Sequence, residues 1–366
     1  MINIRKEQKI TVPNNYREYL KPSYVFIPIK EDKSYPKKAV QENDYIDDKK
    51  IPITGEIVAT AVNGQKRYLI IKNKFNNDDN KINSVLQIND SEQIRDISAD
   101  WSNKIKTDNW SKEIIESLLK KFREQKVLYI DTFDEDPYAF NNYYLLLQEK
   151  DKILLLLEYL LDNDYLQEIY LVIPATYEAV INAYKKIKST KIKLIILNDY
   201  FALSYKDILS KSLRIKKEKI VSIEELLNIY DEVSGDICNY IYVTIKSEEQ
   251  VYVLKVIKYT ILKEILEYLQ IDMSAINITF NNSMLWQPID FKYVLNEETK
   301  LIIVNKKEEL SQKQDNKKDY CFNCGLCYTS CPWHFNPLKK KKCFNCGLCN
   351  YVCPSKKMLK VGDNNG

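Results

Sequence analysis

The sequence predicts a multidomain α/β protein, in which a central parallel α/β sheet is flanked by smaller modules and followed by a cysteine-rich C-terminus. Short β-branched runs broken by Pro and Gly fill the first 80 residues. Strand-like and helix-like segments alternate between residues 126 and 197, a spacing that favours a parallel sheet. Eight of the nine cysteines lie between Cys321 and Cys353. A chain of 366 residues is long enough for two or three such domains.

The composition narrows the classes of protein that the chain can represent. A hydrophobic content of 45% predicts folded cores, and 55 basic residues mixed with 51 acidic ones argue against a nucleic-acid-binding surface. The N-terminus MINIRKEQKITVPNNYREYL has no apolar core of a signal peptide, and no run approaches the ~18 apolar residues of a membrane span. We therefore expect a cytoplasmic protein, with peripheral association at the inner face of a membrane left open.

Residues 1–80 are predicted to form a small β module. Its candidate strands begin at Tyr24, Lys38, Ile51 and Tyr68. The stretch IPITGEIVA, which begins at Ile51, resembles a strand of the barrel-sandwich hybrid fold of biotinyl and lipoyl carriers. The lysine between two methionines that such a carrier presents is absent, so we do not expect a swinging-arm function.

Residues 120–235 are predicted to form the parallel α/β core. Its candidate strands begin at Lys126, Glu168 and Lys191, and its candidate helices cover residues 142–163 and 177–189.

A smaller α/β module is predicted over residues 236–304. Its candidate strands begin at Ile241, Ile276 and Leu301, and a helix is expected over residues 247–260. A polar linker is expected at residues 305–320, and the cysteine-rich domain at residues 321–358.

The cysteines form two copies of the pattern C-x2-C-x2-C-x3-C-P. Three cysteines at this spacing suit one face of a 4Fe-4S cubane, and the fourth, followed by proline, ligates the other cluster. Disulfides are not expected in a reducing cytosol, whereas zinc or a degraded site stays open as an alternative. The predicted ligands of the first 4Fe-4S cluster are Cys321, Cys324, Cys327 and Cys353. Those of the second 4Fe-4S cluster are Cys343, Cys346, Cys349 and Cys331.

Several residues near the cysteines have simpler interpretations. Gly325 and Gly347 correspond in the two copies, at a place where a side chain would crowd a cluster, and Asn323 corresponds to Asn345. His334, the only histidine, is expected at the surface or in packing, and Cys238 is expected to be a buried apolar side chain. The four lysines 339–342 are interpreted as a solvated linker in preference to a docking face for an acidic partner.

The cysteine segment resembles bacterial dicluster ferredoxins, although only ten residues separate Pro332 from Cys343. The order of parts along the whole chain resembles the C subunit of the Rnf-type electron transport complex. That family is related to the cobalamin reductases of propanediol-utilising compartments and to the flavin-binding subunit of complex I. The resemblance implies that residues 120–235 are flavoprotein-like and that residues 236–304 form a β-grasp-like module. Only the cysteine motifs are specific in themselves.

The resemblance does not extend to the flavin site. Where that family carries a Glu-Cys-Glu-Pro loop near the flavin, this chain has Asp134, Glu135, Asp136 and Pro137. The family's glycine-rich loop should come before this segment, but no glycine lies between Gly64 and Gly235. We interpret residues 134–136 as a capped, solvated loop and do not expect FMN or NAD to bind.

The predicted function is iron-sulfur electron transfer by a soluble or peripheral subunit of an Rnf-like, membrane-associated oxidoreductase complex. Expected partners are a ferredoxin or flavoprotein and other subunits of the complex, and nucleic acid is not expected. We identify no catalytic residue, so an electron-transfer subunit is favoured over a stand-alone enzyme. The alternative is a flavin-dependent NADH or cobalamin reductase. A weaker alternative is a non-redox scaffold with structural clusters.

Overall fold

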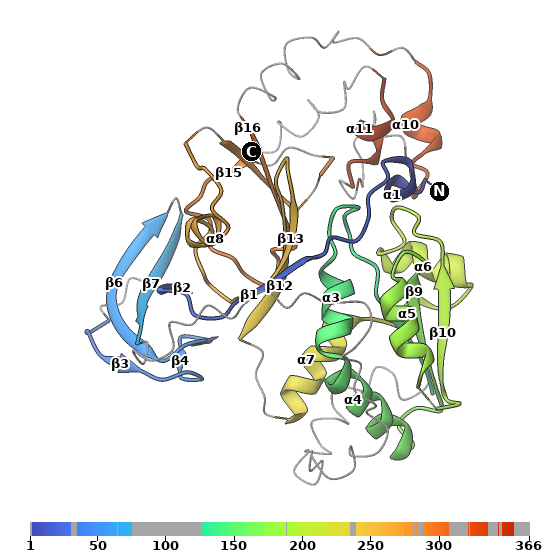
Figure 1. Cartoon of the computed structure of the whole chain (residues 1–366). Coiled ribbons are helices and arrows are strands. Elements are labelled where there is room, and N and C mark those ends of the chain that lie inside the picture. The colour runs from blue at the N-terminus through green and yellow to red at the C-terminus, as the bar shows by residue number, and fades with distance from the viewer. Residues whose placement is uncertain are drawn as a thin grey trace.

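The chain is a mixed α/β protein with several β-sheets, as the computed structural model in Figure 1 shows. The described residues are 2–30, 35–63, 65–74, 126–187, 189–234, 239–274, 276–281, 283–284, 288–306, 321, 323–335, 343 and 346–354. In these ranges the strands form a six-stranded sheet, two four-stranded sheets and a two-stranded sheet.

The first four-stranded sheet is parallel throughout, with strand order β10-β9-β8-β11. Its strands follow one another with helices between them, as the alternating pattern of the sequence predicts. The strands are β8 (Val127–Asp131), β9 (Glu168–Pro174), β10 (Ile192–Leu197) and β11 (Ile220–Ser222).

Helices cover both faces of the parallel sheet. Leu128 and Ile130 point to the face that packs against α3, α4, α5 and α7, whereas Tyr129 and Val172 point to the face covered by α6. Such burial on two faces explains the nearly continuous apolar runs of these strands. The helices are α3 (Asn141–Gln148), α4 (Lys150–Asp162), α5 (Glu178–Lys185), α6 (Lys206–Leu213) and α7 (Ile223–Ser234), with a 3-10 turn at η3 (Lys217–Lys219).

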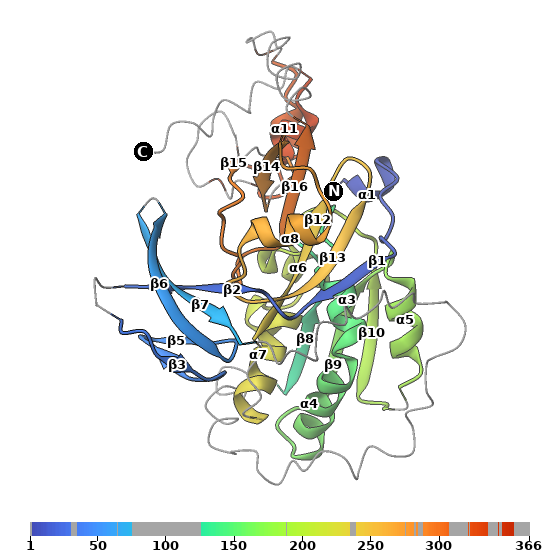
Figure 2. The same ribbon diagram turned by 60° about the vertical axis from the view of Figure 1, so that its left-hand side comes forward.

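The β module near the N-terminus is an antiparallel sheet with strand order β2-β7-β6-β3, curled around its own apolar core (Figure 2). A register shift between Ile57 and Ala59 bends β6. At Gly55 a Cβ atom would lie 2.3 Å from the carbonyl oxygen of Lys72, so only glycine allows this close pairing. The strands are β2 (Tyr24–Ile29), β3 (Ala39–Val40), β6 (Gly55–Asn63) and β7 (Lys66–Asn73), with the pair β4 (Tyr45–Ile46) and β5 (Lys49–Lys50) beside them.

The six-stranded sheet has the order β1-β13-β12-β16-β14-β15. Strand β1 comes from the N-terminal segment and pairs in parallel with β13, so it belongs to this sheet and not to the β module. Helix α8 packs on one face, and Tyr16 and Tyr242 on the other face pack against α3. The elements are β1 (Asn15–Tyr19), β12 (Tyr240–Lys246), β13 (Val251–Ile257), α8 (Leu262–Tyr268), β14 (Ile276–Phe280), β15 (Pro288–Ile289) and β16 (Leu301–Lys306).

Two predictions about secondary structure were wrong. The expected helix over residues 247–260 is strand β13, which pairs with β12 on one side and β1 on the other. Its β-branched valines suit a buried central strand better than a helix. The single helix expected over residues 142–163 is divided at Glu149, whose buried carboxylate accepts hydrogen bonds from Tyr242 and Lys255, each at 2.8 Å.

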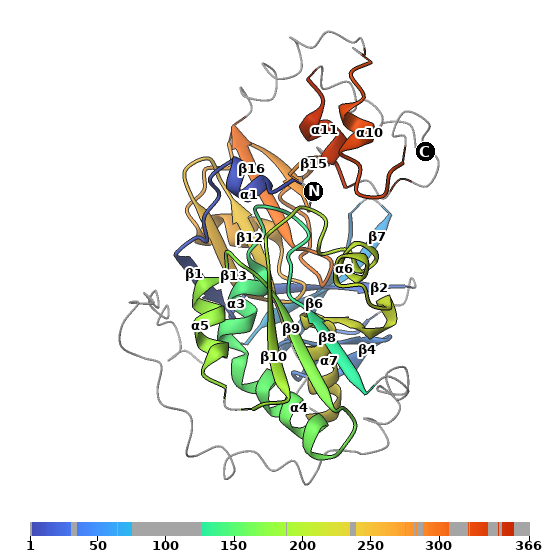
Figure 3. The ribbon, with the colours of Figure 1, turned by 90° about the vertical axis from the view of Figure 1, so that its right-hand side faces the viewer.

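The described part of the C-terminal region contains two short helices, α10 (Leu326–Thr329) and α11 (Leu348–Val352), which lie side by side. They stand beyond the carboxyl ends of the parallel strands, next to α1 (Ile4–Glu7), as Figures 1 and 3 show. Strand β16 reaches Lys306, two residues into the predicted linker, and residues 307–320 lie outside the described ranges. Within those ranges, no helix has the length and hydropathy that crossing a membrane requires.

Candidate functional site

The two cysteine runs have the same local backbone. Gly325 and Gly347 each precede a short helix, with φ of +73° and +77°. Their carbonyl oxygens accept hydrogen bonds from Tyr328 N at 3.0 Å and Asn350 N at 2.9 Å. No protein atom lies within 4 Å of a Cβ placed on Gly325, so the left-handed backbone is itself the reason for glycine there.

The structure brings the thiols together across the two runs. Burial raises the pKa of Cys327, and the thiols that raise it further are those of Cys353, Cys321 and Cys324. Burial also raises the pKa of Cys346 to about 12, with further contributions from the thiols of Cys349, Cys343 and Cys331. The fourth thiol of each run is therefore close enough to the other run to affect its ionisation. Cys349 also interacts with Cys327, so the two groups of thiols are adjacent.

Backbone N–H groups point at two of the sulfur atoms. Asn323 N donates to Cys321 Sγ at 3.4 Å, and Phe335 N donates to Cys331 Sγ at 3.3 Å. Such donors stabilise a thiolate and tune the reduction potential of a cluster bound to it. The eight described cysteines form no disulfide. Among the described residues, no three Cys, His, Asp or Glu side chains are placed to hold a single metal ion.

This donor set suits an iron-sulfur centre. Thiolates are the soft ligands that iron-sulfur clusters take. Their effects on pKa link Cys327 with Cys321, Cys324 and Cys353, and Cys346 with Cys343, Cys349 and Cys331. His334, which we expected at the surface or in packing, is exposed. Cys238, Asn345 and the lysines 339–342 lie outside the described residues.

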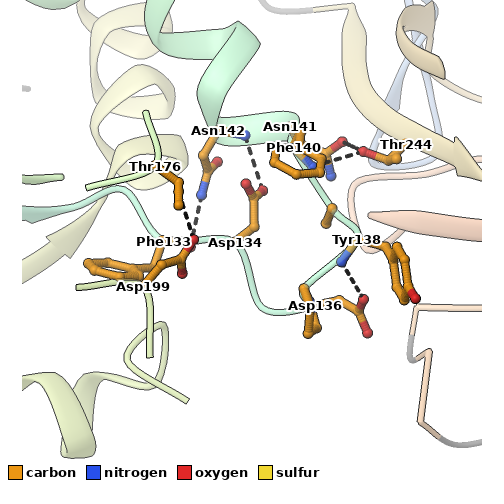
Figure 4. Close-up of polar contacts among 12 residues, drawn as sticks. Phe133, Asp134, Asp136, Tyr138, Phe140, Asn141, Asn142, Thr176, Asp199 and Thr244 are labelled. Carbon is orange, nitrogen blue, oxygen red and sulfur yellow. Dashed lines mark hydrogen bonds between the residues drawn. The ribbon is translucent and has the colours of Figure 1, made fainter. Parts of the chain in front are cut away.

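Glu135 in the acidic loop after β8 is exposed, but the side chains of Asp134 and Asp136 are buried, so the predicted solvated loop is wrong at two of its three acids. Asp134 accepts a hydrogen bond from Asn142 N at 3.1 Å, near the start of α3, and another from the hydroxyl of Tyr177. Asp136 accepts from Ser283 N at 2.7 Å. It also accepts from Tyr138 N at 3.0 Å, as Figure 4 shows together with the bond from Asn142 N to Asp134. Protein donors replace water around both carboxylates, and the backbone donor to Asp134 comes from the first turn of α3.

Arg5, from helix α1, fills the space beside this loop. Its guanidinium donates to Asp199 Oδ2 at 2.5 Å and to the carbonyl oxygens of Pro137 at 2.8 Å and Ala139 at 2.6 Å. It lies 4.3 Å from the centre of the Phe140 ring, and its side chain is 4% exposed. The sequence gives no local signal for these contacts, because Arg5 is more than 100 residues from each partner.

Burial changes the protonation of the neighbouring acids. Burial raises the pKa of Asp131 to about 8, although a hydrogen bond from Phe133 N opposes the shift. Burial also raises the pKa of Asp134 to about 6, and the nearby Arg5 limits that rise. A pocket at this edge of the sheet is lined by Ile4, Arg5, residues 133–137, residues 199–202 and Ser204. The chain's own N-terminus thus forms one wall of the place where open α/β sheets usually bind ligands.

Tyr205 lies between the acidic loop and the second cysteine run. Burial raises its pKa most, followed by the charges of Cys346, Glu135 and Asp136. Its ring forms a T-shaped pair with that of Trp333, with 4.8 Å between the ring centroids. Sequence reasoning did not single out this tyrosine, because it is one of 27 and lies outside both motifs.

Comparisons with known proteins do not assign the chain to a family. No protein-family model matches the chain, and neither does any curated protein. Among solved structures, the H2-reduced form of an NAD+-reducing [NiFe]-hydrogenase aligns with 9% identity and a TM-score of 0.36, over 51% of this chain and 42% of the hydrogenase chain. The air-oxidised form gives 11% identity and a TM-score of 0.38, over 52% and 42%. The chain thus spans less than half of that protein chain, and we base no argument on so low a similarity.

Proposed function

We propose that the eight C-terminal cysteines hold two 4Fe-4S clusters with crossed ligation. One cluster is held by Cys321, Cys324, Cys327 and Cys353, and the other by Cys343, Cys346, Cys349 and Cys331. The observation that carries the proposal is the tandem C-x2-C-x2-C-x3-C-P spacing. The effect of Cys353 on the pKa of Cys327, and of Cys331 on the pKa of Cys346, supports the crossed assignment.

The chain then acts as an electron-transfer protein, since 4Fe-4S clusters accept and release single electrons when they are bound. The chain's own residues supply the thiolates, the N–H donors to sulfur and the burial that tune the reduction potential. We propose that it works as a peripheral subunit of an Rnf-like electron transport complex, with a ferredoxin or flavoprotein as its partner.

The order of modules supports this assignment. Within the six-stranded sheet, the hairpin of β12 and β13, helix α8, and strands β14 and β16 give the order β13-β12-β16-β14. Strands β12 and β16 form the central pair and are parallel, with β13 and β14 on their outer sides. This arrangement, with helix α8, suits a β-grasp-like module at residues 236–304. The curled sheet of β2, β7, β6 and β3 suits a barrel-sandwich-like module within residues 1–80. The parallel sheet suits a flavoprotein-like core at residues 120–235.

We propose that FMN and NAD are not bound at that core. Arg5 occupies the carboxyl edge of the parallel sheet with two hydrogen bonds to backbone carbonyls and an ion pair to Asp199. No glycine-rich loop is available in the sequence for a phosphate group. These two observations disfavour a flavin-dependent NADH or cobalamin reductase.

Reduction of the anaerobically purified chain, followed by EPR spectroscopy, tests the proposal. Reduced ferredoxin and dithionite are each added to protein of known iron content. We expect signals from two interacting reduced clusters with both reductants. Clusters that dithionite cannot reduce would favour the structural scaffold, and a fully loaded chain that takes no electron from a ferredoxin or flavoprotein would contradict the electron-transfer role.

A further inference from the structure

The two cysteine runs have the same backbone but differ in exposure. Helix α10 of the first run has no buried residue, and the cysteine before it, Cys324, is exposed. Leu326 and Tyr328 on α10 are 45% and 50% exposed. In helix α11 of the second run, Leu348 is 2% exposed. A duplicated motif therefore has one outward-facing and one inward-facing copy.

The inward copy is held by the rest of the chain. Leu348 packs in an apolar cluster with Phe201 and Ile208, beyond the ends of the parallel strands. Asn350 Nδ2 donates to Met284 O at 3.3 Å, and the hydroxyl of Tyr351 donates to Glu7 at 2.9 Å. These contacts leave α11 little room for a second protein, whereas α10 stands on the outer side of the pair (Figure 3).

We propose that the exposed surface of Cys324, Leu326 and Tyr328, which we call the α10 surface, docks a small redox protein with acidic residues around its own redox centre. The inference rests on the proposed function, because an electron carrier needs a partner close to its cluster. Leu326 and Tyr328 are two of the large hydrophobic side chains that stay exposed in the described part of the chain. A leucine and a tyrosine beside an exposed thiol suit the apolar centre of a small, transient interface.

The sequence around the α10 surface indicates the charge of the partner. Between residues 317 and 354 the chain has six lysines and a single acid, Asp319. Lys317 and Lys318 come just before Cys321, and the lysines 339–342 end next to Cys343. From the sequence alone these four lysines are interpreted as a solvated linker, and the proposal gives them instead a role in attracting the partner. Positive charge that lies close to the cysteines in the sequence favours a negatively charged partner and speeds the encounter, and salt weakens this effect.

Binding of a small acidic ferredoxin to the iron-loaded full chain tests this proposal. We expect Leu326→Ser together with Tyr328→Ser to weaken the Kd about tenfold, because exposed apolar side chains at the centre of an interface carry much of its affinity. Tyr45→Ser is the matched control, since Tyr45 is 66% exposed on strand β4, in a different sheet. This control is expected to change the Kd less than about twofold, as a contact outside the interface should.

Salt and a second probe test the charge of the partner. Raising the ionic strength from about 0.05 to 0.3 M should weaken binding of the ferredoxin, since this range shortens the Debye length. A basic protein such as cytochrome c should bind more weakly than the ferredoxin. No binding of the ferredoxin, an unchanged Kd in the double variant, or equal binding of cytochrome c would overturn the docking proposal.

The iron content and the reduction by dithionite of each variant keep the two proposals apart. A double variant that holds its iron and is reduced like the wild type, yet keeps the wild-type Kd, contradicts the docking proposal alone. A wild-type chain without iron contradicts the proposed function itself.

Discussion

The carboxyl edge of the parallel sheet and the cysteine region present opposite chemistry. At the sheet edge, the charged groups are paired with other groups of the protein. The side chain of Arg5 is 4% exposed, and its guanidinium donates hydrogen bonds to Asp199 and to two carbonyl oxygens. In the cysteine region, eight thiols gather without a disulfide, and the pKa of Cys346 is raised by burial and by other thiols. Protein groups provide the hydrogen-bond and ion-pair partners in the first region, whereas we propose that the thiols of the second region bind a cofactor.

This difference between the sheet edge and the cysteine region indicates which of them is the better candidate for a cofactor site. A site where open α/β sheets usually bind ligands is occupied here by the chain's own arginine. The cysteine region has the donors for a cofactor but little apolar packing around its first run. We therefore expect the cofactor chemistry to have its place at the C-terminus, with the α/β core as a support.

The largest effect is expected from breaking the crossed ligation. Cys353→Ser should remove one of two clusters, so that iron falls from about eight to about four atoms per chain. The cysteines that become open to alkylation should be Cys321, Cys324 and Cys327, because Cys353 lies with that group. Mass spectrometry of the alkylated protein identifies them.

Cys331→Ser is the matched variant for this experiment. It should expose the thiols of Cys343, Cys346 and Cys349 instead. If each substitution exposed the thiols of its own run, ligation would be local and the crossed arrangement would be wrong.

The next largest effect is expected from opening the sheet edge. Arg5→Ala leaves the carboxylates of Asp134 and Asp199 without their cation, and removing one partner of a buried ion pair costs about 3 to 5 kcal/mol. Chemical unfolding followed by circular dichroism should show a free energy of unfolding lower by that amount.

Lys30→Ala is the control for Arg5→Ala. Lys30 pairs with Asp48 at 2.7 Å, but both side chains are largely exposed, so the loss should be small. Equal effects of the two substitutions would contradict the view that Arg5 closes the sheet edge.

A smaller, pH-dependent effect is expected for Asp131→Asn. Burial raises the pKa of Asp131 to about 8, so the folded state keeps a proton that the unfolded state has released. The stability that this protonated form provides is present at low pH and is lost as the pH rises toward 8. The variant should come close to the wild type near pH 4 and exceed its free energy of unfolding by up to ~1.4 kcal/mol for each pH unit between there and about pH 8.

Asp48→Asn gives the comparison for this pH profile. The hydrogen bond from Lys30 lowers the pKa of exposed Asp48, so its titration is complete well below neutral pH. Its thermal midpoint should therefore keep a constant offset from the wild type between pH 5 and 9. A constant offset for Asp131→Asn as well would contradict the raised pKa.

The smallest effect is expected at the turn before α10. Gly325→Ala places a Cβ on a backbone with φ of +73°, which costs about 1 kcal/mol, or about fivefold in an equilibrium. Iron release to a chelator should be faster by that factor. Gly325→Asn should be milder, because asparagine tolerates the left-handed region. Equal release rates in all three proteins would mean that this backbone is not needed to hold the cluster.

Much of the architecture could be predicted from the sequence, because its signals are local. Each of these signals is contained in a short segment: the apolar runs of β8, β9 and β10, and the two cysteine patterns. Strand β13 was missed because the polar turn at residues 247–250, which joins it to β12 in a hairpin, was interpreted as the start of a helix. Its other neighbour, β1, comes from the N-terminal segment, and no local pattern indicates that pairing. The burial of Asp134 was missed because it depends on Arg5 and Tyr177, which only the folded chain brings near.

One measurement tests most directly whether the cofactor binds at the cysteine region and not at the sheet edge. It is the content of iron, acid-labile sulfide, zinc and flavin per chain, in protein purified without oxygen. We predict about eight iron and about eight sulfide, as two 4Fe-4S clusters require, with neither flavin nor zinc. One flavin per chain would mean that Arg5 does not close the sheet edge, and zinc in place of iron would contradict the redox function of the cysteine region.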